Sequence, residues 1–218
     1  MRGTVTGMVF LSHFLFAAPP AVGQGQECLA GMKMPDVGQW AEYQGVMNKK
    51  DAYTMRYAVV GAEDRGGTSM KWLELRMVGD AKDKNMVYQM LTPGTPAEMD
   101  QAQEVIFKPG ERPAMKMNPM MMKMIRGQLQ KNSVLGNMCE GVSLAGEESV
   151  TVPAGTFKAL RYHNAKYESD TWVVPALPFF MVKAKGKDFE MSLTSRGDGA
   201  KSSITETPQE MPGFGPSK

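Results

Sequence analysis

Methionine is the residue type with the most distinctive spacing in this chain. Six of the ten positions from Met115 to Met124 are methionine, and the whole sequence contains 21. Unbranched thioether side chains adapt to apolar partners of varying shape, and they are also ligands for soft metals such as Cu(I). The run therefore predicts an apolar binding surface, a soft-metal site, or methionines that only fill gaps in a core.

The neighbours of these methionines favour the apolar surface over the metal site. The triplet Met-Lys-Met occurs at residues 32–34, 115–117 and 122–124, and no carboxylate lies between Met115 and Met124. Lysines beside neutral sulfurs disfavour a bound cation, because like charges repel. We therefore expect no metal and no cofactor. A Cu(I) binder remains the alternative, as does a structural envelope protein that binds no ligand.

Residues that could support catalysis are sparse. His163 is the only histidine beyond His13, and it lies on a predicted strand between Tyr162 and Asn164. A lone strand histidine is more often a hydrogen-bonded structural residue than a base, and one histidine cannot form a two-histidine metal site. The chain also lacks a phosphate-binding glycine loop, a nucleophile elbow and zinc-ligand spacing. The sequence thus predicts no catalytic residue and a protein that is not an enzyme.

Charge excludes one class of partner. The 25 basic residues nearly balance the 23 acidic ones, with no basic block and no stripe of lysines or arginines between aromatic residues. Nucleic-acid-binding proteins present such a patch. We expect no nucleic-acid partner, and we expect a monomer.

The first two dozen residues are typical of an export signal. Arg2 carries the only side-chain charge before the apolar run from Met8 to Ala18, and the stretch Pro19–Gly23 ends in small residues. This pattern predicts a signal peptide over residues 1–23 that is cleaved, and a periplasmic or secreted protein. An uncleaved anchor is the alternative, although the apolar run is shorter than the roughly 20 residues of a spanning helix.

Two cysteines, Cys28 and Cys139, both fall in the exported part. An even pair in an oxidising compartment predicts a disulfide. Such a bond would close a loop of about 110 residues and stabilise the fold by roughly 4 to 5 kcal/mol in the chain-entropy description.

Short alternating segments dominate the rest of the chain. Apolar and polar residues alternate, and clusters of Gly, Asp, Asn and Pro separate the segments. The spacing leaves no room for crossover helices, so the strands should pair as antiparallel hairpins and curl to hide one apolar face. We predict a mainly β protein with one curved antiparallel sheet, a half-barrel, built from strands at Trp40–Val46, Tyr53–Val60, Met70–Val78, Met86–Leu91, Gln103–Lys108, Glu147–Val152, Thr156–Asn164, Ser169–Val174, Phe179–Lys185, Phe189–Ser195 and Ala200–Thr205.

One helix is predicted, and it should cover the opening of the half-barrel as a lid. Asn118 is a preferred N-cap, Pro119 occupies the first helical position, and Met117 and Met122 are spaced as a hydrophobic staple. Continued to Lys131, the helix places Met121, Met124 and Ile125 on one face, with Met120 and Leu129 beside them and Lys123, Arg126 and Gln130 opposite.

Together these features resemble the LolA/LolB-like superfamily of periplasmic lipoprotein carriers. The resemblance is carried by the turn Val152–Phe157, by Trp172–Pro175 and by Leu177–Lys183, about a fifth of the chain. It implies a cavity between sheet and helices that receives acyl chains, without a catalytic residue.

We therefore expect a non-enzymatic binding protein for a lipid or other hydrophobic molecule, with a half-barrel domain at residues 24–206 and a flexible tail at 207–218. Prolines do not fit a central strand, so the apolar segment between Pro175 and Phe180 should be a loop or an edge. It should line the mouth of the cavity, touch a membrane transiently, or pack onto the same core. The predicted ligand-binding residues are Met117, Met120, Met121, Met124, Ile125, Trp172, Leu177, Phe179 and Phe180.

Overall fold

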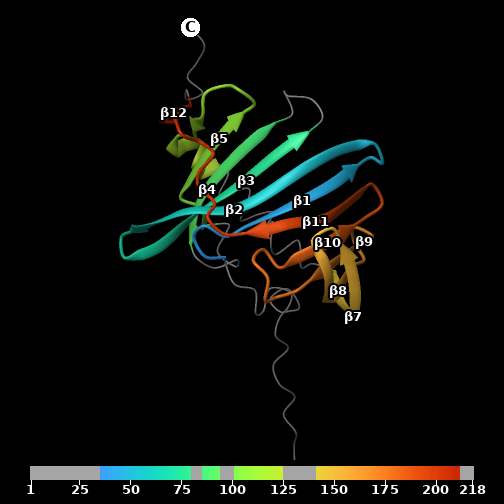
Figure 1. Cartoon of the computed structure of the whole chain (residues 1–218). Helices are drawn as coiled ribbons and strands as arrows, with labels where there is room; N and C mark the ends of the chain where they lie inside the picture. Colours follow the sequence, from blue (N-terminus) through green and yellow to red (C-terminus); the bar gives the residue numbers. More distant parts are fainter. Residues whose placement is uncertain (1–34, 80–84, 94–100, 125–140, 212–218) are drawn as a thin grey trace, which may run out of the picture.

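A computed structural model describes residues 35–79, 85–93, 101–124 and 141–211 of the chain. These residues form one open, curved sheet, so the predicted mainly β fold is confirmed. The sheet has the strand order β12-β6-β5-β4-β3-β2-β1-β11-β10-β9-β8-β7 (Figure 1). Its strands are β1 (Trp40–Met47), β2 (Asp51–Arg65), β3 (Thr68–Gly79), β4 (Met86–Pro93), β5 (Glu104–Pro109), β6 (Met115–Lys116), β7 (Val142–Val152), β8 (Gly155–Asn164), β9 (Ser169–Val173), β10 (Met181–Lys185), β11 (Phe189–Gly197) and β12 (Gln209–Glu210).

The pairing is antiparallel in every described ladder except that of β6 with β12, which is parallel. Strands consecutive in the chain are neighbours within β1–β6 and within β7–β11. The pairing of β1 with β11 joins these two halves across the chain. Short turns connect β1 to β2, β2 to β3 and β7 to β8, as the spacing of turn residues predicts.

Alternation within β11 shows why the sequence forms strands. Met191 and Leu193 are buried, whereas Glu190, directly before Met191, is exposed. Side chains of a strand point to opposite faces in turn, so one face of β11 becomes dry. Leu193 pairs with Tyr43 of β1, and Tyr43 is fully buried.

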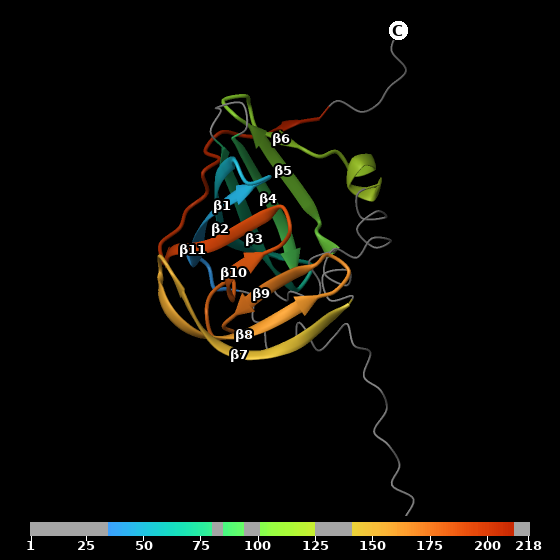
Figure 2. The ribbon, with the colours of Figure 1, turned by 90° about the vertical axis from the view of Figure 1, so that its right-hand side faces the viewer.

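Different segments cover the two faces of the β1–β6 half of the sheet (Figure 2). One face carries the helical turn that follows β6, and we name it the helix-side face. The other face carries the segment between β11 and β12, and we name it the tail-side face. In Figure 2 the helical turn lies to the right of the sheet and the C-terminal segment to its left.

The C-terminal segment is not the strand expected at Ala200–Thr205, and that prediction is wrong. Its polar groups bond to side chains instead of to a strand ladder: the Ser203 amide donates to Glu74 Oε2 at 2.9 Å, and the Ser202 hydroxyl donates to the Ile204 carbonyl. Ile204 is buried with Ile106 and Ala114. Beyond Thr207, where the sequence predicts a flexible tail, Gln209–Glu210 pairs with β6 as β12.

The predicted start of the helix is confirmed, but a covering lid is not. Residues 119–124 are helical, and Asn118 Oδ1 accepts a hydrogen bond from the Met121 amide at 2.9 Å, as an N-cap does. The continuation from Ile125 to Lys131 lies outside the described residues. So do the predicted signal peptide at 1–23 and both cysteines of the predicted disulfide, Cys28 and Cys139.

Candidate functional site

The helix-side face of β1–β6 carries apolar side chains in cross-strand rows. Strand register places Met55, Met77 and Met86 beside Tyr43 in one row. The next row is almost entirely apolar and half aromatic, and it crosses all six strands. Its members are Ala41, Tyr57, Leu75, Tyr88, Phe107 and Met115.

These two rows differ in burial from a third row on the same face. Val59, Leu73 and Val105 of the third row are buried. By contrast, Met55 and Met77 are only half-buried. The same holds for the central and far members of the second row, which are Tyr57, Leu75, Tyr88, Phe107 and Met115. The helix-side face is therefore shielded from solvent at one end, whereas apolar side chains over its middle remain partly exposed.

The helical turn after β6 closes the dry end of the face. Met122 is 3 % exposed and packs with Ala102 and Val105, and Met117 and Met90 lie against that cluster. The predicted staple residues Met117 and Met122 are thus in one cluster. Burying two flexible thioether side chains against Val105 contributes to holding the turn on the sheet.

The other predicted methionines are not buried together. Met120 and Met124 are 65 % and 51 % exposed, and Met121 is half-buried. The buried member of the turn is Met122, one residue from the predicted Met121. The physical reason is that the packing partners are Val105 of β5 and Ala102 just before that strand, which the periodicity of the helix cannot specify. Ile125 lies outside the described residues.

The loop between β9 and β10 covers another part of the helix-side face. Phe179 stacks at an angle on Tyr57, with ring centroids 5.8 Å apart, and Leu177 joins the same core cluster. The Tyr43 hydroxyl donates to the Met181 carbonyl at 3.0 Å, which ties the loop to β1. Burial raises the pKa of both Tyr43 and Tyr57, so both rings stay neutral at physiological pH.

The loop backbone is unusual at its two phenylalanines. Phe179 and Phe180 have φ angles of 59° and 39°, a region that L-residues rarely occupy. Phe180 closes the loop, because its carbonyl accepts from the Val174 amide at 2.7 Å and its amide donates to the Leu177 carbonyl at 3.0 Å. Packing of Phe179 on Tyr57 offsets part of the backbone strain.

Trp172 lies apart from the predicted lid methionines. By register Trp172 is in one row with Lys183, Ser192 and Gln44. Because this row is on the tail-side face, Trp172 lies on that face too. Its indole Nε1 donates to Glu148 Oε1, and the Arg161 guanidinium and the Lys183 ammonium lie 5.6 Å and 5.7 Å from the ring centroid. Trp172, Leu177 and Phe179 belong to one core cluster and Met117 to another.

His163 contacts a carboxylate on the neighbouring strand. Its Nδ1 lies 3.1 Å from Asp170 Oδ1, while Arg161 donates twice to the same carboxylate. These bonds, first that of Arg161 and then that of His163, lower the pKa of Asp170. The arrangement is a cross-strand cluster in which the Arg161 guanidinium compensates the negative charge of the Asp170 carboxylate.

The described part of the chain holds no group of three or more His, Cys, Asp or Glu side chains placed to bind a metal. In the same part, no helix is long and apolar enough to cross a bilayer.

Sequence reasoning missed most of the half-buried rows. Tyr57, Tyr88, Phe107, Met77 and Met86 were assigned to strands but not to a site. The signal was present, since Leu73, Leu75 and Met77 alternate with polar residues along β3. What was lacking was the register between neighbouring strands, which decides which side chains share a row.

Comparisons with known proteins add solved structures of low similarity. No family model matches the chain, and no curated protein matches it. A predicted exported protein with a YmcC-like fold from Bacteroides fragilis aligns with a TM-score of 0.40 and 10% identity over 77% of this chain and 99% of its own. A predicted lipoprotein from Parabacteroides distasonis aligns with a TM-score of 0.36 and 10% identity over 75% of this chain and 97% of its own. Similarity at this level transfers neither fold family nor function to this chain.

Proposed function

We propose that this chain is an exported, non-enzymatic protein that binds a lipid acyl chain on the helix-side face of its sheet. The supporting observation is the pair of cross-strand rows that run from Tyr43 to Met86 and from Ala41 to Met115, whose members beyond β1 are half-buried. Three adjacent methionines, Met55, Met77 and Met86, give this surface an adaptable floor.

The energetics favour a long apolar ligand. Each methylene group removed from water contributes about 0.8 kcal/mol, so a chain lying across several strands would gain affinity in proportion to its buried length. Tyr57, Tyr88 and Phe107 add rigid aromatic contacts at small cost in side-chain entropy. A neutral Tyr57 suits an uncharged acyl chain.

The wider assignments belong to the same proposal. They are a LolA/LolB-like carrier fold, a periplasmic or secreted location after cleavage at residue 23, a Cys28–Cys139 disulfide and a monomeric state. The loop from Pro175 to Phe180 would lie at the mouth of the site and touch the donor membrane transiently.

Adjacent residues of β3 provide the test. Met77 lies on the helix-side face and Val78 on the tail-side face, and both are half-buried. We expect Met77→Asp to abolish retention of a co-purified lipid, because a carboxylate placed against an acyl chain must be desolvated. Val78→Asp introduces the same charge on the other face and should retain the lipid.

The measurement is native mass spectrometry of periplasmically expressed protein, with circular dichroism to establish that both variants fold. Binding of a fluorescent fatty-acid analogue to the delipidated protein gives a second readout. Wild-type protein that carries no lipid and does not bind the analogue would refute the proposal. Lipid retention by a folded Met77→Asp variant would place the site elsewhere.

A further inference from the structure

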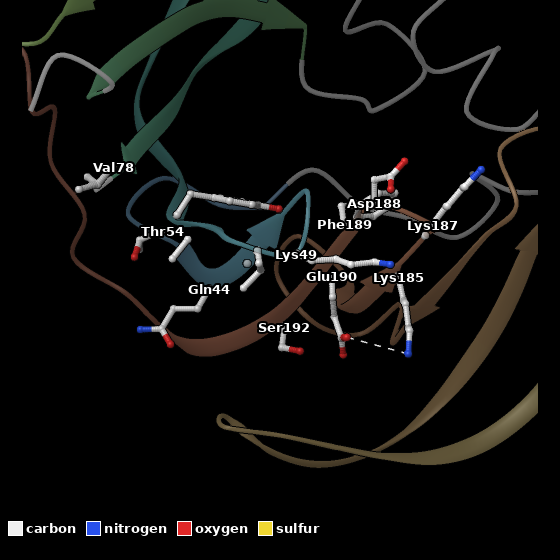
Figure 3. Close-up of a pocket in the computed structure, with 16 residues that line it drawn as sticks. Gln44, Lys49, Thr54, Val78, Lys185, Lys187, Asp188, Phe189, Glu190 and Ser192 are labelled. Atoms are coloured by element: carbon white, nitrogen blue, oxygen red, sulfur yellow. Dashed lines mark ion pairs between the residues drawn. The ribbon is translucent and has the colours of Figure 1, made fainter. Parts of the chain in front are cut away.

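A hollow lies at the end of the sheet where two turns meet the end of β3 (Figure 3). Its volume is about 740 Å³. The turns are those between β1 and β2 and between β10 and β11, and they are joined by a hydrogen bond from the Asn48 amide to the Asp188 carbonyl at 2.7 Å. We name this hollow the turn-end pocket.

The floor of the turn-end pocket is a row of uncharged polar side chains. Strand register aligns Ser192 of β11, Gln44 of β1 and Thr54 of β2 on the tail-side face, and all three line the pocket. In the part of the chain that the structure describes, none of these three side chains has a hydrogen-bond partner. The row thus presents two hydroxyls and one amide to a ligand.

Lysines lie at one end of this floor. Lys49 and Lys187 line the pocket without an ion pair to any described residue, and Figure 3 shows Lys49 and Lys185 at the same end of it. The nearby Glu190 carboxylate already forms ion pairs with Lys183 at 2.8 Å and with Lys185 at 4.0 Å. The hydrogen bond from Lys183 keeps the pKa of Glu190 below its ordinary value, so this carboxylate does not need Lys49 as a partner.

The position of Lys49 also has a backbone cost. Its φ is 63° and that of Asn48 is 51°, as in a type I′ turn, where glycine is preferred at the position of Lys49. A lysine at this position lowers the stability of the folded protein relative to a glycine. The turn nevertheless places the Lys49 ammonium group beside the pocket.

From this geometry we propose that the turn-end pocket binds a hydroxylated anion, such as a sugar acid. The anionic group would lie at Lys49, and the hydroxyl groups would bond to Gln44, Thr54 and Ser192. The polar floor of this site is on the face opposite the acyl-binding surface, and the inference does not depend on the proposed function.

Titration of the folded full chain with glucuronate, glucose and inorganic phosphate tests the proposal by amide NMR. We expect glucuronate to shift resonances of residues 44–54 and 185–192 saturably, and to bind more tightly than glucose or phosphate, each of which offers half of the recognised groups. Lys49→Glu should weaken glucuronate binding about tenfold, which corresponds to one charge-assisted hydrogen bond. Lys201→Glu, an exposed position outside the pocket, makes the same change in net charge and should leave binding unchanged.

Ser192→Ala gives an independent variant, because it removes a hydroxyl from the floor without altering charge. It should weaken both glucuronate and glucose. Equal losses in Lys49→Glu and Lys201→Glu, equal affinities for glucose and glucuronate, or shifts outside the pocket would each overturn the proposal. The outcome is separable from the acyl-binding test, since Met77→Asp should leave glucuronate binding intact and Lys49→Glu should leave lipid retention intact.

Discussion

At the scale of single residues, Met122 shows how neighbouring methionines take different roles. Met122 is buried against Val105, whereas Met124, two positions later, is half exposed to solvent. Both residues belong to the run that the sequence singles out, and the helical period placed Met124 on the apolar face with Met121 and Ile125. Residue type therefore predicted an apolar cluster, but the sheet beneath the turn selected which member is buried.

This difference predicts unequal effects on stability. Met122→Ala should reduce the free energy of unfolding by about 2 to 4 kcal/mol, because it removes buried methylene groups and leaves a cavity. Met124→Ala should change it by less than about 0.5 kcal/mol, as exposed substitutions do. Urea denaturation followed by circular dichroism measures both. Similar losses in the two variants would contradict the packing described for the turn.

At the scale of elements, the hairpins agree with sequence patterning, and their turns carry the exceptions. Segments predicted at Tyr53–Val60 and Met70–Val78 lie within β2 and β3. The β1–β2 turn departs from the usual turn chemistry, because Lys49 takes a left-handed conformation that favours glycine. Likewise, Phe179 and Phe180 take positive φ values in the β9–β10 loop. Both exceptions lie beside a proposed site.

The turn offers a test in which stability and binding change in opposite directions. Lys49→Gly should raise the free energy of unfolding by roughly 1 kcal/mol, since it relieves a left-handed conformation in an exposed turn. The same change removes the ammonium group and should weaken glucuronate binding. Chemical denaturation and the NMR titration measure the two effects on one sample. Destabilisation by Lys49→Gly would show that the lysine side chain contributes packing that outweighs the backbone strain.

At the scale of the whole molecule, the C-terminal segment acts as a strap across the tail-side face. Gln89 Nε2 donates to Glu74 Oε2 and to the Ser202 hydroxyl, each at 2.7 Å, and these contacts anchor the start of the strap on β3 and β4. Glu206 anchors its middle, by accepting from Lys108 Nζ at 2.7 Å and from the Ala114 amide at 3.2 Å. The strap ends as β12 on β6.

Acid should loosen this strap at Glu206. The hydrogen bond from Lys108, with further backbone donors, lowers the pKa of Glu206 to about 2 from an ordinary 4.5. A lowered pKa in the folded state means that the stabilisation is complete above the ordinary pKa and is lost as pH falls towards 2. The difference in unfolding free energy between wild type and Glu206→Gln should therefore be constant above pH 5 and shrink towards pH 2.

Carboxyl-detected NMR gives the direct measurement, because the Glu206 resonance should titrate near pH 2 and the Ala114 amide should follow it. Thr205→Gln is a matched exposed control on the same strap and should show no such pH-dependent difference. A Glu206 titration near pH 4.5 would contradict the described contacts.

Features that depend on near neighbours in the chain could be predicted from the amino-acid order. Period-two alternation located most strands, and Asn118 followed by Pro119 located the start of the helix, because these signals act within a few residues. Which distant residues come into contact depends on how the folded sheet packs. The hydroxyl of Tyr43 bonds to a carbonyl 138 positions away, at Met181, and the rows from Ala41 to Met115 exist only once six strands are in register. Register and long-range pairing arise from the packing of the whole sheet, so local patterns could predict an apolar face but not the side chains that share it.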